Sequence, residues 1–130
     1  VDKILKETSD ENLAGIFVDF HAEVTSEKYA LSFYLDGRVS AVIGTHTHVP
    51  TSDPRISEKG TAFMTDSGMV GSFDSVIGVK KELIINHFLT QMPVKFEPEE
   101  EGKMVFNGVI VELDVESKKA LNVFHVQKFL

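Results

Sequence analysis

Two histidines, His46 and His48, stand one residue apart in the stretch GTHTHVPTSDPRI, directly after the apolar run VSAVI. In an extended backbone, residues i and i+2 point to the same side and lie about 6.5–7 Å apart. This spacing allows both imidazoles to bind one metal ion, or each to bind one of two ions about 3.5–4 Å apart. Two exposed loop histidines would produce the same pattern, so the spacing alone leaves both interpretations open.

A third histidine, His21, follows another apolar run, GIFVDF. Ligands of open α/β sheets gather at the carboxyl ends of the strands, so His21 and the later pair are predicted to meet at one edge of a sheet. The chain has no cysteine, so any metal ion has to be held by imidazole and oxygen ligands. The two remaining histidines, His87 and His125, lie in a helical and a β-rich stretch, and we expect them to be structural.

The elements that position these histidines follow a strand, helix, strand order. Residues 15–20 and 39–43 are short continuous apolar runs, typical of strands that are buried on both faces. The stretch TSEKYALSFYLDG between them predicts a helix with Thr25 and Ser26 as N-caps and Gly37 just past its end. The pattern therefore indicates a βαβ unit with a parallel sheet.

The rest of the chain changes from mixed to β-rich. A third strand is predicted at residues 61–65, and a glycine-rich loop at 66–78 and a helix at 80–90 follow it. Segments 94–97, 104–113 and 120–129 are rich in β-branched residues and predict an antiparallel sheet. Residues 114–119 would form the hairpin loop between the last two strands. The fold class is therefore α/β, and the long loop at 66–78 is a candidate border of a substrate pocket.

Composition limits the class of protein and the partners that it can bind. The chain has 130 residues with 42% hydrophobic content, which suits a single globular domain. A net charge of −7 argues against non-specific nucleic-acid binding, because such a chain repels phosphates. No apolar stretch approaches the roughly 18 residues of a membrane span, and the charged start does not resemble a signal peptide. We therefore expect a soluble, cytoplasmic protein without a membrane partner.

Three stretches, FVDFHAEVTSEKYAL, DGRVSAVIGTHTHVPTSDPRI and GTAFMTDSGMVG, carry a resemblance to a known family. Together they closely resemble the C-terminal half of the YmdB-type metallophosphoesterases, a calcineurin-like branch associated with cyclic nucleotide phosphodiesterase activity. The Gly-Asp and Gly-Asn-His motifs that follow the opening Asp-x-His of such enzymes do not occur between Ala22 and Ile43. The sequence DFH is therefore interpreted as the isolated histidine that precedes the closing pair.

The resemblance implies a dinuclear metal site at strand ends in an αββα sandwich, whose C-terminal half, with parallel strands and helices followed by antiparallel strands, is residues 1–130. His21 and His46 would bind one metal ion, and His48 would reach toward the other. The ions would be divalent or trivalent iron, manganese or zinc, and the substrate a cyclic nucleotide-type phosphodiester. The family's other ligands and its catalytic histidine belong to an N-terminal half that precedes Val1. The isolated chain is therefore expected to be inactive and to depend on that half, a second chain or a homo-oligomer.

Several neighbouring residues are candidates for orienting the imidazoles, because ligating histidines usually donate their other ring nitrogen to a carboxylate or carbonyl. Asp19 and Asp66 lie near the right strand ends, whereas Asp53 is more simply a turn aspartate. Strand alternation predicts that Thr45 and Thr47 point away from the two histidines.

Two other interpretations remain. A non-catalytic metal-binding or protein-interaction module would use an exposed parallel-sheet edge to pair with another polypeptide. An amidohydrolase-like barrel is disfavoured, because its His-x-His follows the first strand and such barrels need about 250 residues.

Overall fold

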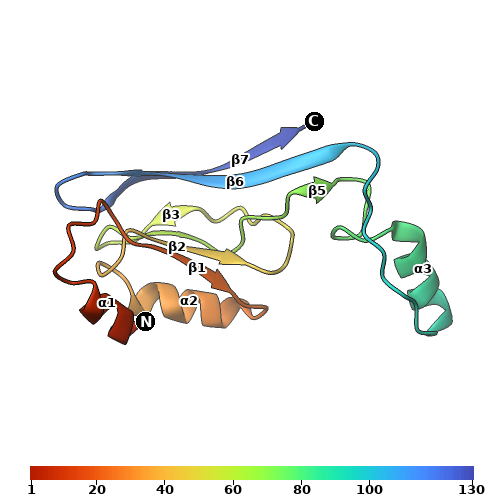
Figure 1. The fold of residues 1–130 in the computed structure, drawn as a ribbon, viewed down its shortest axis with the longest axis horizontal. Helices are drawn as coiled ribbons and strands as arrows, with labels where there is room; N and C mark the ends of the chain where they lie inside the picture. The colour runs from red at the N-terminus through yellow and green to blue at the C-terminus, as the bar shows by residue number, and fades with distance from the viewer.

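The computed structural model describes residues 1–130 and contains three helices and seven strands in two sheets (Figure 1). The helices are α1 (Asp2–Glu7), α2 (Thr25–Tyr34) and α3 (Lys81–Thr90). The strands are β1 (Phe17–His21), β2 (Ala41–Thr45), β3 (Arg55–Ile56), β4 (Ala62–Met64), β5 (Gly71–Ser72), β6 (Met104–Leu113) and β7 (Ala120–Phe129). The α/β class predicted from the sequence is confirmed, with parallel and antiparallel strands.

The first sheet has the order β1-β2-β4-β3. Strand β1 pairs in parallel with β2, and β2 with β4, so the predicted βαβ unit is confirmed. The prediction that the first strand is buried on both faces is wrong: burial alternates along β1, and Phe17 is 58% exposed. The physical reason is its position, because β1 is the edge strand of the sheet and has a neighbouring strand, β2, on one side only.

Helix α2 covers one face of this sheet (Figure 1). Tyr29 and Leu31 of this helix pack on a core cluster of four buried residues, Leu35, Val39, Val42 and Phe63. The predicted N-caps are wrong: Val24 is the N-cap, and no side chain caps the helix. Thr25 and Ser26 therefore lie within the first turn, beyond the position from which a side chain caps the free N–H groups.

The β6–β7 hairpin lies across the opposite face of the first sheet (Figure 1). The small side chains of Ala41, Ala62 and Ala120 form the contact between the two layers. The hairpin loop at 114–119 is confirmed. The strand predicted at residues 94–97 is wrong, because only the adjacent Pro98 makes an isolated bridge, to Val79. Prolines at both ends of that segment lack the N–H that a strand ladder requires.

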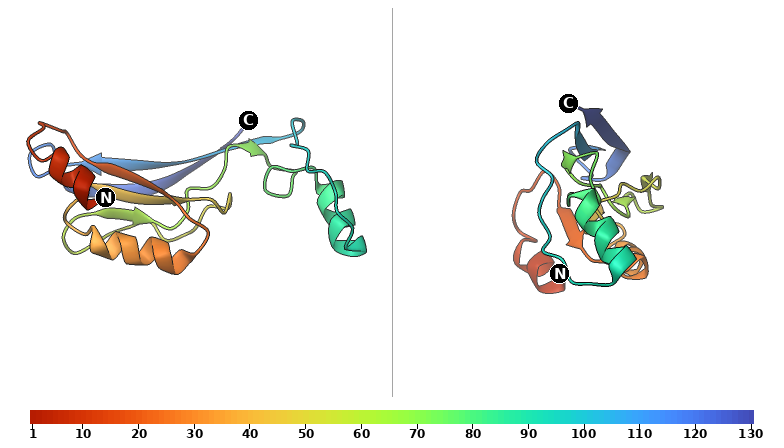
Figure 2. Two further views of the ribbon diagram at one scale, coloured as in Figure 1. Left: turned by 60° about the horizontal axis from the view of Figure 1, so that its bottom comes forward. Right: turned by 90° about the vertical axis from the view of Figure 1, so that its right-hand side faces the viewer.

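Helix α3 projects beyond the ends of both sheets (Figure 2). One of its residues, Ile84, is buried, whereas Phe88 is 68% exposed and Leu89 79%. No helix of the structure has the length and apolar character needed to cross a membrane.

Candidate functional site

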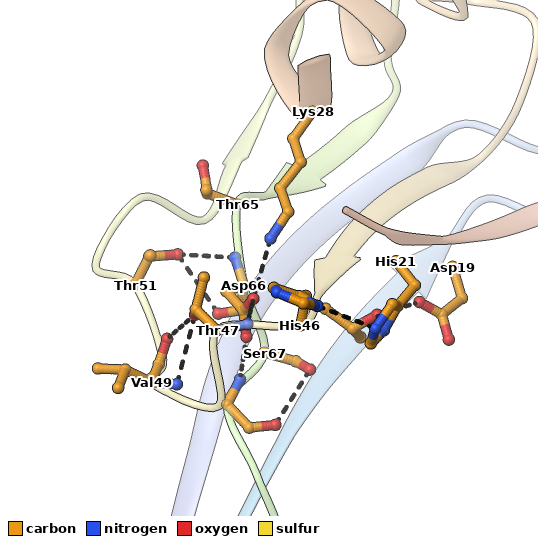
Figure 3. Close-up of polar contacts among 12 residues, drawn as sticks. Asp19, His21, Lys28, His46, Thr47, Val49, Thr51, Thr65, Asp66 and Ser67 are labelled. Carbon is orange, nitrogen blue, oxygen red and sulfur yellow. Dashed lines mark hydrogen bonds and ion pairs between the residues drawn. The ribbon is translucent and has the colours of Figure 1, made fainter. Parts of the chain in front are cut away.

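His21 and His46 come together at the carboxyl ends of β1 and β2 (Figure 3). His21 is the last residue of β1, and His46 follows β2 directly. Nε2 of His21 lies 3.1 Å from Nδ1 of His46, and the two exposed rings meet edge to face with their centroids 4.9 Å apart. The structure thus brings together two of the three histidines that the sequence placed at a common strand edge.

A hydrogen-bonded relay fixes which nitrogen of each ring carries the proton. The Thr45 hydroxyl donates to Oδ1 of Asp19 over 2.9 Å, so its oxygen is free to accept from Nδ1 of His21, 3.1 Å away. In the neutral form of the His21 ring, Nε2 is then the unprotonated nitrogen and accepts from Nδ1 of His46. Asp19 therefore acts on His21 through Thr45, and the prediction that Thr45 points away from the histidines is wrong.

The spacing of this pair suits a metal ion. Two ligand atoms that each lie about 2.1 Å from a metal ion, on adjacent octahedral positions, are about 3 Å apart. This is close to the separation of the two histidine nitrogens. Binding would require His46 to give up its Nδ1 proton. Within this chain no three His, Cys, Asp or Glu side chains converge closely enough to hold a metal ion. The assignment of His21, His46 and His48 as metal ligands stays a prediction.

His48 lies apart from the pair and contacts a different segment. Its Nδ1 is 2.7 Å from the carbonyl oxygen of Ile77, and because a carbonyl only accepts, this nitrogen carries the proton. Nε2 of His48 is left with a free lone pair. The extended geometry assumed for the His-x-His stretch is wrong, because His46 and His48 have φ values of 118° and 66°.

Gly44 lies within β2. A Cβ at this position would lie 1.8 Å from the carbonyl oxygen of Thr65. Glycine is therefore required for the close approach of the backbone to Thr65, at the base of the histidine loop.

A buried ion pair holds the loop that carries His46 and His48. Nζ of Lys28, which is fully buried, lies 2.9 Å from Oδ2 of Asp66. The same carboxylate accepts the N–H of Thr47 at 2.9 Å and that of Gly68 at 2.9 Å (Figure 3). Asp66 thus positions the loop through the backbone between the two histidines, without the direct contact to an imidazole that the sequence suggested.

These contacts also determine the charge of Asp66. Burial by itself raises the pKa of its carboxyl group, but the N–H groups of Gly68 and Thr47 and the Lys28 ammonium outweigh burial. The net pKa of Asp66 lies below its ordinary value, so the carboxylate is charged near neutral pH.

Sequence reasoning missed Lys28 and underrated Asp53. Lys28 lies three and seven positions before Leu31 and Leu35, which pack in the core, so helical periodicity would have indicated that it points inward. Asp53 is more than a turn residue, because its carboxylate accepts the Tyr29 hydroxyl at 3.2 Å and the Thr65 N–H at 3.1 Å. It ties α2 to the end of β4.

The other two histidines lie away from the pair. Nδ1 of His87 is 2.8 Å from the carbonyl oxygen of Met92, at the end of α3. Nε2 of His125 is buried without a hydrogen-bond partner, in the β6–β7 hairpin opposite Val109.

The family model described as "YmdB-like protein" matches residues 1–126, so the chain belongs to the YmdB-like family. The chain is 54% identical over 108 residues to a Bacillus subtilis protein named 2',3'-cyclic-nucleotide 2'-phosphodiesterase, and these cover 83% of this chain and 40% of the relative. It is 46% identical over 119 residues to a Mycoplasma pneumoniae protein named putative phosphatase/phosphodiesterase, covering 91% and 41% of the two chains.

Two solved structures have the same fold over nearly the whole chain. A hypothetical protein from Thermus thermophilus superposes with a TM-score of 0.86 at 41% identity, over 98% of this chain and 48% of that one. A structure described as a novel phosphatase, from Mycoplasma pneumoniae, gives a TM-score of 0.86 at 42% identity, over 98% and 46%. The chain therefore spans less than half the length of these relatives.

Proposed function

We propose that the complete protein is a metal-dependent phosphodiesterase that hydrolyses cyclic nucleotide-type phosphodiesters, and that this chain supplies His21, His46 and His48 to a dinuclear site. The observation that carries the proposal is the relay from Asp19 through Thr45 and His21 to His46 at two adjacent strand ends. The names of two relatives support the activity.

The residues of the chain suit this role. Imidazole ligands are accepted by iron, manganese and zinc alike, so they fit these metals without selecting one. Such ions, when bound, polarise the phosphoryl oxygens and lower the pKa of an attacking water molecule. The chain's own contribution is to hold His21 through Thr45 and to anchor His48 through Ile77.

The remaining ligands and the acid that protonates the leaving group are not among these residues. We propose that they come from an N-terminal half of the same αββα domain, with the edge of β1 as the surface that meets it. In the chain β1 pairs with β2 only, and Phe17 and Asp19 are exposed on its face.

Replacement of the histidines tests the proposal in the full-length protein. His21→Ala, His46→Ala and His48→Ala are each expected to lower turnover of a 2',3'-cyclic nucleotide at least about 100-fold, with less bound metal by elemental analysis, because each removes a ligand. His87→Ala is the matched control, since that ring contacts Met92, Phe88 and Phe96, in α3 and the segment that follows it. Unchanged turnover in the first three variants, with their fold intact by circular dichroism, would reject the assignment.

The exposed edge of β1 favours a second candidate, a non-catalytic metal-binding or interaction module. It predicts that the full-length protein binds metal through His21 and His46 but hydrolyses no phosphodiester. The same assays separate the two candidates.

A further inference from the structure

A cavity of about 200 Å³ opens beside His48, between the histidine loop and the start of the segment that leads to α3. Its walls are mainly apolar and include Met69, Phe73 and Ile77. It is smaller than the roughly 300–1,000 Å³ pockets that hold drug-sized ligands, so it suits one ring system.

The aromatic wall is held in place and remains accessible. The Phe73 ring packs edge to face on Phe129 with centroids 5.0 Å apart, yet Phe73 is 51% exposed. Ile77 is 49% exposed. An exposed, positioned aromatic ring beside an apolar cavity is a stacking surface for a planar heterocycle.

The floor of the cavity carries two amides. Asn107 is 7% exposed; its Nδ2 donates to the Met69 carbonyl over 2.7 Å, and its Oδ1 accepts from Nε2 of Gln127 over 2.9 Å. Oε1 of Gln127 has no partner in the chain, so this side chain offers an acceptor and its remaining N–H to a ligand. The floor can therefore meet the donor and acceptor edge of a nucleobase.

His48 connects this cavity to the proposed reaction site. Its Nδ1 donates to the carbonyl of the wall residue Ile77, so the free Nε2 of His48 stands at the border of the cavity. A nucleotide whose phosphate faces His48 has its base within reach of Phe73.

We propose that this cavity is the base subsite of the phosphodiesterase, with Phe73 as the stacking surface and Gln127 as the polar contact. The assignment rests on the proposed function for its substrate class and adds the residues that distinguish a nucleotide from another phosphodiester.

The test uses the full-length protein and two substrates, adenosine 2',3'-cyclic phosphate and the base-free methyl ribofuranoside 2,3-cyclic phosphate. Phe73→Ala is expected to raise KM for the nucleotide about 10-fold, because one stacked base is lost, with little change for the base-free substrate. Phe88→Ala, which removes an exposed ring from α3, is the matched control. Equal effects of Phe73→Ala on both substrates, or no effect on either, would overturn the subsite.

Calorimetric titration with adenosine 3'-monophosphate and with ribose phosphate separates this result from a failure of catalysis. The nucleotide is expected to bind about 10-fold more tightly than the sugar phosphate, and Phe73→Ala is expected to remove that difference. This outcome would support the subsite even in a protein without turnover. Equal binding of the two ligands by the unmodified protein would reject the subsite whatever the activity.

Discussion

At the residue scale, the site depends on hydrogen bonds that orient imidazoles. Thr45 is the central residue, because its one hydroxyl serves both Asp19 and His21. Replacing it removes the relay without placing a new charge at the strand end.

Thr45→Val is therefore expected to weaken metal binding by the full-length protein about 10–100-fold, the usual effect of losing a group that orients a ligand. Competitive titration with a metal indicator measures the affinity. Thr90→Val is the control, because that hydroxyl donates to the Asn86 carbonyl and accepts the Met92 N–H, both at the end of α3. An unchanged affinity would mean that the Asp19 contact does not orient His21 in the metal-bound state.

The sequence predicted part of this arrangement. Strand-end placement brought His21 and His46 together correctly, because parallel strands end at one edge. The sequence did not predict the left-handed backbone at His46 and His48. The pattern of apolar residues carries no information on a loop whose geometry is set by distant contacts. The Lys28–Asp66 pair, which shapes that loop, joins residues 38 positions apart.

At the element scale, the close contact between β2 and the residue after β4 leaves no room for a side chain at position 44. Gly44→Ala is expected to destabilise the protein by about 3 kcal/mol or more, because its Cβ would lie 1.8 Å from the Thr65 carbonyl oxygen and backbone has to move. Urea unfolding measures the free energy.

Gly71→Ala in β5 is the matched control, since a Cβ there meets only the Met69 sulfur at 4.0 Å. Its effect is expected to stay within about 1 kcal/mol. Similar unfolding free energies for the two variants would show that β2 and the Thr65 backbone separate easily.

Strands were predicted well where an apolar run or β-branched composition marked them, as in β2 and the β6–β7 hairpin. The burial of β1 was predicted wrongly, because an apolar run does not reveal whether a strand lies at the edge or the centre of a sheet. The failure at residues 94–97 has a local cause, because the flanking Pro93 and Pro98 outweigh β-branched composition.

At the scale of the whole molecule, two carboxylates join separate parts of the fold. Asp66 links α2 to the histidine loop, and Asp53 links α2 to the end of β4. Partial burial raises the pKa of Asp53, but bonds from Thr51 and Thr65 outweigh it and bring the pKa below its ordinary value of 3.8.

Because both folded-state pKa values lie below those of the unfolded chain, these groups stabilise the protein above about pH 4 and lose that effect as the pH falls through their folded-state pKa values. Asp53→Asn is expected to lower Tm at pH 6, and the gap to the unmodified protein is expected to narrow toward pH 3. Asp74→Asn, which removes an exposed carboxylate, is the control. A gap that stays constant from pH 6 to pH 3 would show that the Asp53 carboxylate does not couple folding to protonation, and that its bonds to Thr51 and Thr65 stabilise the fold equally well when it is neutral.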